Sequence, residues 1–512
     1  MTKKIIACDL GTGGNKASLY DGDGNCIEST FVPYETFYPH TGWHEQRPLD
    51  WWNAVVESTR RLLEKRNDER GNIDSIAFSG HSLGVVPLGK NGELLREATP
   101  IWSDTRAEKQ VKELFEQTDR ERWYKTTGNG FPPACYSVFK IMWYREKEPE
   151  MFKRIHRIIG TKDFINYKLT GTLITDYSYA SGSGVYDLKN WRYSSDLIDA
   201  AGISEELFPR IVPSTHIIGE LTEEATGALG LSRHVSVVCG GVDNSCMALG
   251  ARNIEEGRVY TSLGSSSWIA VSSAQPILDY ARSPFVFTHV IPGMFTSAVS
   301  IFAAGSALEW VKENLCKNLV QAAERQKRDV YELINERAER SPIGAKKLLF
   351  NPSLAGGSSQ DSTPHIRGAF AGLDMGHTQE DILRSCMEGI AMNLGIVLDV
   401  LREFCALSDE MLMVGGGSKS RFWRRIFADV YNMKILKTNI DQDAGSLGAA
   451  ALAAVGSGLW GDFKRIDEIH QIQEITEPIP AHVKKYEQLR PACEHIRVTQ
   501  SELGDLLHGI EV

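Results

Sequence analysis

Two short segments of the chain contain residues of the types, and at the spacing, that hold a phosphate group. In each, an apolar strand runs into a Leu-Gly step with a hydroxyl residue beside it, and the chain turns back into a second strand. The first turn spans residues 10–14 and the second spans residues 263–266. Glycine lets the backbone approach an anion closely, and successive N–H groups in a tight turn form a concave anion site. One such turn is typical of an ordinary hairpin, but two of them, one in each half of the chain, predict a duplicated domain that closes on one polyphosphate.

Two aspartates stand where chemistry on such a phosphate would need them. Asp9 ends the strand that leads into the first turn, and Asp243 follows the apolar strand 235–238 and two glycines, where a helix is predicted to begin. A carboxylate beside a phosphate turn usually holds a divalent cation, since it would otherwise repel the phosphate. An aspartate at a helix start can also simply cap the helix, but the preceding glycines leave room for a ligand. We therefore predict a metal ion near Asp9 and take Asp243 as the strongest single candidate for catalysis.

A third glycine-rich turn, Val-Gly-Gly-Gly-Ser-Lys-Ser at residues 414–420, lies between a predicted strand and a predicted helix. Such a turn suits the approach of a phosphate or a flat ligand to a helix N-terminus. It is not a Walker A loop, because the glycine before Lys-Ser is missing and the spacing differs. The first strand is not followed by G-x-G-x-x-G, so the sequence gives little support for a dinucleotide-binding fold.

One further motif favours a different class of enzyme. Residues 80–84, Gly-His-Ser-Leu-Gly, match G-x-S-x-G, the nucleophile elbow of α/β hydrolases, in which Ser82 would be the nucleophile. The elbow needs a helix directly after the serine, whereas residues 85–92 are typical of a strand and a turn. The serine hydrolase is therefore kept as the weaker alternative.

Composition excludes several other classes. The chain has 512 residues, 42% hydrophobic and 24% charged, as in an ordinary globular protein, and this length favours two domains. A net charge of −10 argues against nucleic-acid and anionic-membrane partners, which favour a basic face. The nine cysteines include no Cys-x-x-Cys pair, so we expect buried thiols in a reducing cytosol rather than disulfides or zinc. With no signal segment and no stretch of about 18 apolar residues, the expected location is cytoplasmic.

The elements that position these residues recur in the two halves of the chain, and strands mixed with helices imply α/β layers. The strands are predicted at residues 3–10, 15–20, 25–32, 73–79, 84–88, 235–238, 258–271, 286–300 and 410–414. The helices are predicted at residues 48–65, 305–314, 378–405 and 480–498, and most of residues 104–205 is expected to be helical. The domain boundary is placed near residues 252–257.

The motifs taken together resemble the FGGY carbohydrate kinases of the actin-like ATPase superfamily, and among them the xylulokinases. The likeness extends over nearly the whole chain. The segments that carry it are residues 9–16 (first phosphate hairpin), 43–52 (W-x-E-Q-x-P…WW), 102–106 (W-x-D-x-R), 162–171 and 175–181 (K-D…L-T-G…T-D-x-S-x-A-S), 240–244 (G-G-x-D-N), 262–266 (second phosphate hairpin) and 415–423 (adenosine-side motif).

The resemblance implies an α/β fold of two actin-like, ribonuclease H-like domains, residues 1–252 on the sugar side and 253–512 on the ATP side, that flank a cleft for ATP and sugar. It implies transfer of a phosphoryl group from ATP, with Mg²⁺ near Asp9, to a primary hydroxyl of a ketose such as xylulose, with Asp243 as general base. The implied sugar contacts are His81, Ser82, Leu83, Asp104 and Asn244. The implied ATP contacts are Thr12, Gly13, Gly14, Lys16, Gly264, Ser265, Gly305, Gly416, Gly417 and Ser420. The implied partners are the sugar and ATP, without nucleic acid or membrane, and a homodimer is compatible with the resemblance.

Two departures from the family pattern bear on the substrate. Gly13 stands where the family commonly has Ser or Thr, so backbone N–H groups replace one hydroxyl contact to phosphate. The xylulokinase motif G-Q-M-H-G is here Gly-His-Ser-Leu-Gly, so Leu83 takes the place of the usual histidine and His81 lies just before the sugar-contacting pair. A buried sugar hydroxyl without its partner costs about 1–3 kcal/mol. Ribulose, erythrulose, fuculose and glycerol therefore remain alternative acceptors.

A non-catalytic or chaperone-type actin-like ATPase is the remaining alternative class. Proteins of that class lack an aspartate in the Gly-Gly-x-Asp-Asn setting, so Asp243 speaks against it.

Overall fold

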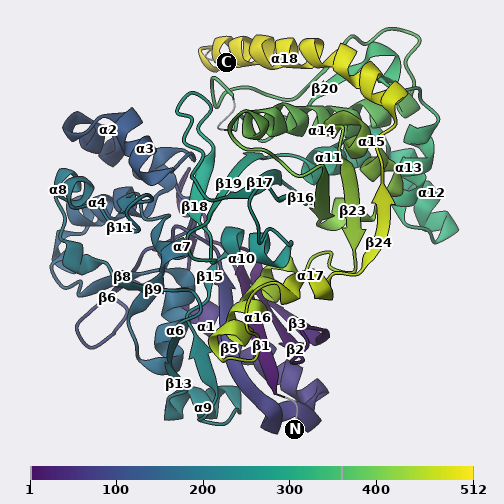
Figure 1. Ribbon diagram of the computed structural model, residues 1–512. Coiled ribbons are helices and arrows are strands. Elements are labelled where there is room, and N and C mark those ends of the chain that lie inside the picture. Colours follow the sequence, from purple (N-terminus) through teal and green to yellow (C-terminus); the bar gives the residue numbers. More distant parts are fainter. Residues whose placement is uncertain (1–2, 359–360, 511–512) are drawn as a thin grey trace. The chain divides into compact units, whose positions relative to one another are not determined.

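The computed structural model describes residues 3–358 and 361–510 (Figure 1). Contacts divide the chain into two compact units. The first unit comprises Met1–Glu256, Ser272–Ser297 and Asp443–His470, and the second comprises Gly257–Val271, Ala298–Gln442 and Gln471–Val512. This grouping differs from the single cut predicted at residue 252, because residues 443–470 pack within the first unit although they lie late in the sequence.

The first unit is built on a mixed sheet with the strand order β13-β14-β5-β1-β2-β3, and β15 pairs with β5. Its strands are β1 (Lys4–Gly11), β2 (Gly14–Tyr20), β3 (Cys26–Pro33), β5 (Ile73–Gly80), β13 (Ile217–Glu220), β14 (Ser236–Val238) and β15 (Gly241–Val242). The central strand β1 runs antiparallel to β2 and parallel to β5. Two helices pack directly on this sheet: α1 (Pro48–Lys65) on β2 and β3, and α16 (Ala444–Gly456) on β1 and β5. A third helix, α10 (Asp243–Gly250), packs mainly on α16.

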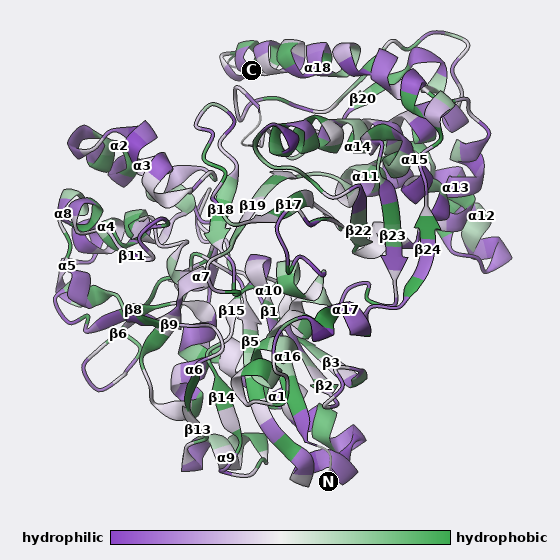
Figure 2. Ribbon diagram, in the orientation of Figure 1, coloured by the Kyte–Doolittle hydropathy of each residue, from purple (hydrophilic) through white to green (hydrophobic). Residues whose placement is uncertain are grey.

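Local sequence explains these elements. Pro48 starts α1 at the position where proline is best tolerated, and Trp51, Val55 and Leu62 are buried along one face of that helix. The residues of β1 alternate little in polarity because both faces of the strand are covered, and Ile6, Cys8 and Leu10 are fully buried. Figure 2 shows hydrophobic residues along β1 and β5.

A second, mainly helical region of the first unit follows β6 (Val86–Leu88) and carries its own apolar cluster. Its elements are β7 (Thr99–Pro100), α2 (Glu108–Gln117), α3 (Arg120–Thr127), α4 (Ser137–Lys147), α5 (Pro149–Phe152), β8 (Arg157–Ile159), α6 (Thr161–Thr170), β9 (Ile174–Asp176), α7 (Tyr177–Ala180), β10 (Tyr186–Asp187), β11 (Arg192–Tyr193), α8 (Ser195–Ala201) and β12 (Arg210–Val212). The helical content predicted for residues 104–205 is therefore present, with short strands between the helices. The remaining elements of this unit are β4 (Glu45–Gln46), α9 (Glu223–Leu229), β18 (Phe285–Thr288) and α17 (Arg465–Ile469).

The second unit repeats the plan around the strand order β17-β16-β22-β23-β24. These strands are β16 (Val259–Leu263), β17 (Ser267–Ser273), β22 (Glu410–Val414), β23 (Lys434–Thr438) and β24 (Ile472–Thr476). Its central strand β16 runs antiparallel to β17 and parallel to β22, as β1 does with β2 and β5. The duplication predicted from the two phosphate turns is thus confirmed.

Helices of the second unit surround this sheet. They are α11 (Gly305–Leu315), α12 (Lys317–Gln326), α13 (Val330–Glu339), α14 (Gln379–Phe404), α15 (Arg421–Tyr431) and α18 (Pro480–His508), and the shorter strands are β20 (Leu349–Asn351) and β21 (Ala369–Ala371). A capping box of Thr378 and Asp381 starts α14 where the sequence predicted it. Figure 2 shows mainly hydrophilic residues on α12 and α13.

Two predicted elements differ from the structure. The strand predicted at residues 286–300 is two strands, β18 and β19 (Phe295–Ile301), because Pro292-Gly293 makes a turn between them. The last helix continues to His508, ten residues beyond the predicted end, with Pro491 inside it. Within residues 3–358 and 361–510, no helix is both long and apolar enough to cross a membrane.

Candidate functional site

The first phosphate turn is a tight hairpin. β1 and β2 pair up to Gly11 and Gly14, which leaves Thr12 and Gly13 as the two-residue loop. A Cβ on Gly14 would lie 2.5 Å from the carbonyl oxygen of Val32, so this glycine is required by packing against β3. A Cβ on Gly13 would meet nothing within 4 Å, and Gly13 is exposed. The open side of the loop is therefore at Gly13, as a phosphate contact requires.

Two side chains from other segments hold this loop. Gln46 donates from Nε2 to the carbonyl oxygen of Thr12 at 2.8 Å, and Trp51 Nε1 fixes Gln46 by donating to its Oε1 at 2.9 Å. Trp102 Nε1 donates to Oγ1 of Thr12 at 2.9 Å. Because the Thr12 hydroxyl accepts that bond, its own proton is left to donate to an anion. We did not predict Gln46 and Trp102 as site residues, although both lie in segments that carry the family resemblance.

Asp9 lies beside this hairpin and against the start of α16. Its Oδ1 accepts a hydrogen bond from Ser79 Oγ at 2.7 Å. A Cβ on Gly445 would lie 2.9 Å from Oδ2 of Asp9, so the glycine allows the carboxylate and the helix to approach. Burial raises the pKa of Asp9, while the Ser79 hydrogen bond and the charge of Lys16 lower it and the charge of Asp443 raises it.

Lys16 is held by a residue that sequence reasoning missed. Its Nζ forms a hydrogen-bonded ion pair with Oδ1 of Asp443, the residue directly before α16. The two residues are 427 positions apart in the chain. A signal was available, because Asp443 lies between a strand and a helix that begins Ala-Gly, a setting similar to that of Asp243.

Asp243 is the first residue of α10, directly after β15. Its Oδ1 accepts hydrogen bonds from the backbone N–H of Asn244 at 2.8 Å and from Nδ2 of Asn244 at 3.2 Å. Burial, with the charge of Asp9 acting in the same direction, raises the pKa of Asp243 to about 7. A carboxyl with a pKa near neutrality is suited to accept and release a proton under physiological conditions.

The raised pKa of Asp243 predicts a change in stability. The Asp243 carboxyl binds its proton more tightly in the folded state than in the unfolded state, so the bound proton stabilises the fold. This stabilisation is lost as pH rises from about 4 to about 7. An asparagine at this position does not titrate, so Asp243→Asn is expected to be more stable than the wild type by about 1–3 kcal/mol at pH 8, and equal to it below pH 4. Denaturant unfolding at pH 4, 6 and 8 measures this. Exposed Asp196 in the first turn of α8, changed in the same way, is the control, and a difference that does not depend on pH contradicts the assignment.

His81, one of the three predicted sugar contacts at residues 81–83, has a buried side-chain nitrogen without a hydrogen-bond partner among the described residues. The side chain is buried, its ring meets the Trp51 ring edge-on at 5.5 Å, and Nδ1 lies 3.3 Å from Oγ1 of Thr161. Burial lowers the pKa of His81 to about 4, so the ring is neutral. Nε2 has no hydrogen-bond partner in the part of the chain that the structure describes. Buried polar atoms nearly always have a partner, which suggests that Nε2 meets a ligand or water.

Leu83 has a different setting. Its backbone is left-handed, with φ 62°, and its side chain is buried in the apolar cluster that includes Val85, Tyr136 and Val138. Its carbonyl oxygen accepts a hydrogen bond from Nζ of Lys140 at 3.2 Å, and the same Nζ donates to the carbonyl oxygen of Ile101 at 2.6 Å. Lys140 is fully buried, and burial lowers its pKa to about 8. Lys140 thus joins the loop of Leu83 to the loop that leads to Asp104.

Asp104 is engaged in a buried ion pair. Its Oδ2 accepts from Arg106 Nη2 at 2.7 Å and from the backbone N–H of His44 at 2.7 Å, and its Oδ1 accepts from Arg106 Nε at 2.9 Å. The Arg106 guanidinium lies 3.9 Å above the ring of Trp43 and contacts Glu45 at 2.8 Å. These contacts give Asp104 a structural role, and its contact with a sugar stays a prediction.

Ser82 is not placed as a nucleophile elbow. β5 ends at Gly80, a bend follows, and the chain continues into the strand β6, where the elbow has a helix. Ser82 is also buried. We expect that a fluorophosphonate probe will not label Ser82 and that Ser82→Ala will not change any background esterase activity. Labelling found by peptide mass spectrometry and lost in Ser82→Ala would restore the hydrolase alternative.

In the second unit, the turn between β16 and β17 is packed against the start of α11. The backbone N–H of Gly305 donates to the carbonyl oxygen of Gly264 at 2.9 Å, and the N–H of Ser306 donates to that of Ser265 at 3.1 Å. A Cβ on Gly305 would lie 2.4 Å from the carbonyl oxygen of Gly264, so glycine is required there. Ser265, at the tip of the turn, is exposed.

The glycine run after β22 lies beside the same turn. Gly415 has φ 89°, and a Cβ there would lie 2.7 Å from the carbonyl oxygen of Leu263. A Cβ on Gly417 would lie 2.4 Å from the Leu263 side chain, whereas Gly416 is exposed and has no atom nearer than 3.8 Å. Ser420 caps α15 by accepting from the N–H of Trp423 at 3.0 Å. The structure therefore brings together the three segments of this unit that hold predicted ATP contacts, with Gly416 on the open side.

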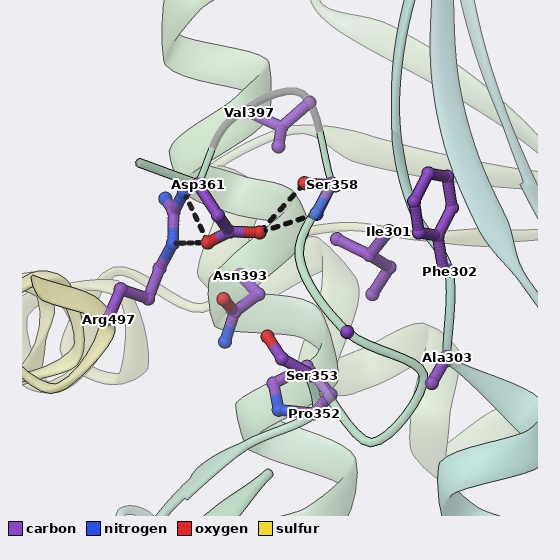
Figure 3. A pocket seen from close by; sticks show the side chains of 11 residues that line it. Ile301, Phe302, Ala303, Pro352, Ser353, Ser358, Asp361, Asn393, Val397 and Arg497 are labelled. Carbon is purple, nitrogen blue, oxygen red and sulfur yellow. Dashed lines mark hydrogen bonds and ion pairs between the residues drawn. The ribbon is translucent and has the colours of Figure 1, made fainter. Parts of the chain in front are cut away.

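A pocket of the second unit is lined by none of the predicted site residues (Figure 3). The described residues that line it are Ile301, Phe302, Ala303, Pro352, Ser353, Gly356, Ser358, Asp361, Asn393, Val397 and Arg497. Figure 3 shows its charged groups turned toward one another: Asp361 accepts from the N–H and hydroxyl of Ser358 at 2.8 and 3.0 Å and pairs with Arg497 at 3.2 Å. The charged groups of this pocket therefore bind each other and join the loop that contains Ser358 and Asp361 to α18 through Arg497.

Comparison with known proteins identifies relatives of this chain in sequence and in structure. A family model of the N-terminal domain of FGGY carbohydrate kinases matches residues 4–250, and one of the C-terminal domain matches residues 259–457. A xylulose kinase of Staphylococcus epidermidis is 30% identical over 510 residues, 99% of each chain. The crystal structure of a ligand-bound xylulose kinase from Lactobacillus acidophilus has a TM-score of 0.88 at 27% identity, covering 97% of this chain and 98% of that one. A gluconate kinase from the same organism has a TM-score of 0.89 at 27% identity, covering 98% and 99%.

The two family models together match well over half of the chain. The matched residues include both phosphate turns and Asp243. The solved relatives share its duplicated, actin-like architecture over nearly the full length. The chain is therefore a carbohydrate kinase and belongs to the FGGY family.

Proposed function

We propose that this kinase transfers the γ-phosphoryl group of ATP to a terminal primary hydroxyl of a small ketose, with Asp243 as the general base. The observation that carries the proposal is the setting of Asp243, a carboxyl with a pKa raised to about 7 at the start of α10, after two glycines. Its Oδ1 accepts both bonds from Asn244, which leaves Oδ2 to accept the proton of the attacking hydroxyl. General-base catalysis of this kind typically contributes about 10²–10⁴-fold to the rate.

The residues of the first phosphate turn have complementary roles in this proposal. The Thr12 hydroxyl and the N–H groups around Gly13 donate to phosphate oxygens, and Lys16 adds positive charge beside them. In the second unit, the exposed glycine Gly416 and the turn at Ser265 are the proposed nucleotide contacts. Phosphoryl transfer needs little covalent chemistry from the protein, so positioning and charge compensation provide most of the catalysis.

The residues around Asp9 fit a magnesium ion. Among the described residues no group of three or more His, Cys, Asp or Glu is arranged to hold a metal, but Asp9 and Asp443 lie close enough for their charges to interact. Mg²⁺ characteristically uses one or two carboxylates and completes its shell with waters and substrate phosphates. Mg²⁺ bound near Asp9 would supply positive charge to the transferring phosphoryl group. Asp9 and Asp443 would hold it, and Lys16 would keep their mutual repulsion low.

A neutral sugar suits the first unit better than the gluconate suggested by the second solved relative. A sugar acid needs a cation for its carboxylate. The buried cations next to the predicted sugar residues, Arg106 and Lys140, are engaged with Asp104 and with two backbone carbonyls. His81 Nε2 is instead matched to a hydroxyl, because a neutral imidazole nitrogen exchanges one hydrogen bond with it. Gluconate remains the second candidate because of the full-length likeness to the gluconate kinase.

A substrate panel with coupled detection of ADP tests the proposal. It compares kcat/KM for D- and L-xylulose, D- and L-ribulose, erythrulose, L-fuculose, glycerol and gluconate. We expect a ketose of about five carbons to give the highest value, and His81→Gln to raise its KM more than it lowers kcat. If gluconate leads, the neutral-sugar proposal is wrong, while the kinase assignment stands.

A further inference from the structure

A buried chain of hydrogen bonds in the first unit ends on the backbone directly before Asp243. Ser178, in α7, accepts at Oγ a hydrogen bond from the backbone N–H of Val242 at 2.9 Å and donates to Oδ2 of Asp176. Val242 is the last residue before α10, which begins with Asp243. We infer that Ser178 and Asp176 are positioning residues that fix the direction of the Asp243 carboxylate. This inference rests on the proposed role of Asp243.

Asp176 is a firmly held acceptor. Its Oδ2 also accepts from the N–H of Ser178 at 2.9 Å and from Oγ of Ser214 at 2.8 Å, and its Oδ1 lies 2.9 Å from Nζ of Lys162. Lys162 also pairs with Asp163 at 2.6 Å, and the side chains of Lys162, Asp163 and Asp176 are all buried. Because Oγ of Ser178 donates to Oδ2 of Asp176, a free lone pair of Oγ is left to accept from Val242 N–H.

The segment before Asp243 pairs with β5 through Gly241 and Val242, and the bond to Ser178 adds a side-chain anchor to that pairing. Gly240 has φ 73°, and a Cβ there would lie 2.1 Å from the carbonyl oxygen of Phe78. A Cβ on Gly241 would lie 2.5 Å from the side chain of Val290 and 3.1 Å from Ser178 Oγ. Two adjacent glycines have the widest choice of backbone angles, and no side chain to restrict them. Hydrogen bonds to the backbone must therefore set the angle at which α10 starts.

Hydrogen bonds from other segments hold the backbone at residues 239, 240 and 242. Asn166 Nδ2 donates to the carbonyl oxygen of Cys239 at 2.8 Å, and the N–H of Gly240 donates to the carbonyl oxygen of Ser214 at 3.0 Å. Beside the pairing of Gly241 and Val242 with β5, the bond from Val242 to Ser178 is the bond to another segment's side chain that lies nearest to Asp243 along the chain. Since a displacement of about 1 Å at a reacting group can cost about 100-fold in rate, this last bond is the one expected to matter for catalysis.

The test compares Ser178→Ala with Ser214→Ala. Both variants remove one hydroxyl donor from Oδ2 of Asp176, but Ser214→Ala keeps the backbone carbonyl that holds Gly240. We expect Ser178→Ala to lower kcat by about 10–100-fold, with the KM values for ATP and sugar within about twofold of the wild type. Ser214→Ala is expected to leave kcat within about twofold. If both variants lower kcat equally, the network acts only on stability and the inference is wrong.

Hydrogen exchange provides a readout that does not depend on activity. In Ser178→Ala, the peptide that contains residues 239–244 should exchange its amide protons at least several-fold faster than in the wild type, and in Ser214→Ala it should not. Unchanged exchange in Ser178→Ala overturns the inference. If Ser178→Ala does not fold, Ser178→Cys keeps the size of the side chain but replaces the oxygen by a weak acceptor, and the same comparison is made with it.

A double variant separates this inference from the proposed function. In the Asp243→Asn background, adding Ser178→Ala should change the residual kcat by less than about twofold, because the group that it positions is gone. A further loss of 10-fold or more means that Ser178 acts independently of Asp243. If Asp243→Asn alone is as active as the wild type, it is the proposed function that fails, whatever Ser178→Ala does.

Discussion

Asp243→Asn is expected to lower kcat for phosphoryl transfer by about 10²–10⁴-fold, while the affinity for ATP changes by less than about threefold. Asparagine keeps the shape of the side chain and its acceptor for the N–H of Asn244, but it cannot take a proton from the sugar hydroxyl. The measurement is steady-state kinetics with the preferred sugar, combined with calorimetric titration of an ATP analogue.

The control for this variant is Asp196→Asn, which makes the same change in the first turn of α8, at a side chain 71% exposed. Its kcat should stay within about twofold of the wild type. A kcat within about tenfold of the wild type in Asp243→Asn would falsify the assignment of the base. In the wild type, kcat should fall as pH is lowered through about 7, because the carboxyl is then protonated and cannot act as a base.

Gly448→Ala is expected to destabilise the first unit by about 2 kcal/mol or more. Gly448 lies in α16, and a Cβ on it would lie 1.9 Å from the carbonyl oxygen of Cys246 in α10. A Cβ on Gly250 of α10 would lie 1.9 Å from the carbonyl oxygen of Ala444, so the two helices contact each other through glycines in both directions. Separating them costs more than the roughly 1 kcal/mol that alanine gains in helix propensity.

The matched control is Gly227→Ala in α9, where a Cβ would meet nothing within 4 Å. There only the helix propensity changes, so stability should rise by about 0.5–1 kcal/mol. Urea unfolding followed by tryptophan fluorescence gives both values. Equal effects at the two glycines would show that the helix contact does not constrain residue 448. Gly448→Ala should also lower kcat, because the helix that it displaces begins beside Asp9 and Asp443.

The sequence by itself determined the local parts of the candidate site. The Leu-Gly turns, Asp9 near the end of β1, Asp243 directly after β15 and the capped helix α14 are encoded within a few residues, because backbone angles and caps depend on near neighbours. The resemblance to the FGGY kinases indicated which reaction these parts would serve, and the family models confirm that the chain belongs to this family. Periodicity alone would have left the serine hydrolase open, and the strand after Ser82 removes its structural basis.

Only the tertiary structure decided which partners those residues meet. Lys16 is bound by Asp443, 427 positions away, and the Thr12 loop is held by Gln46 and Trp102. The carboxylate of Asp104 accepts from Arg106, two positions away, and also from the backbone N–H of His44, 60 positions away. The long-range bonds among these depend on how segments far apart in the chain pack together, and neither the hydrophobic pattern nor the turn residues of any single segment specify that.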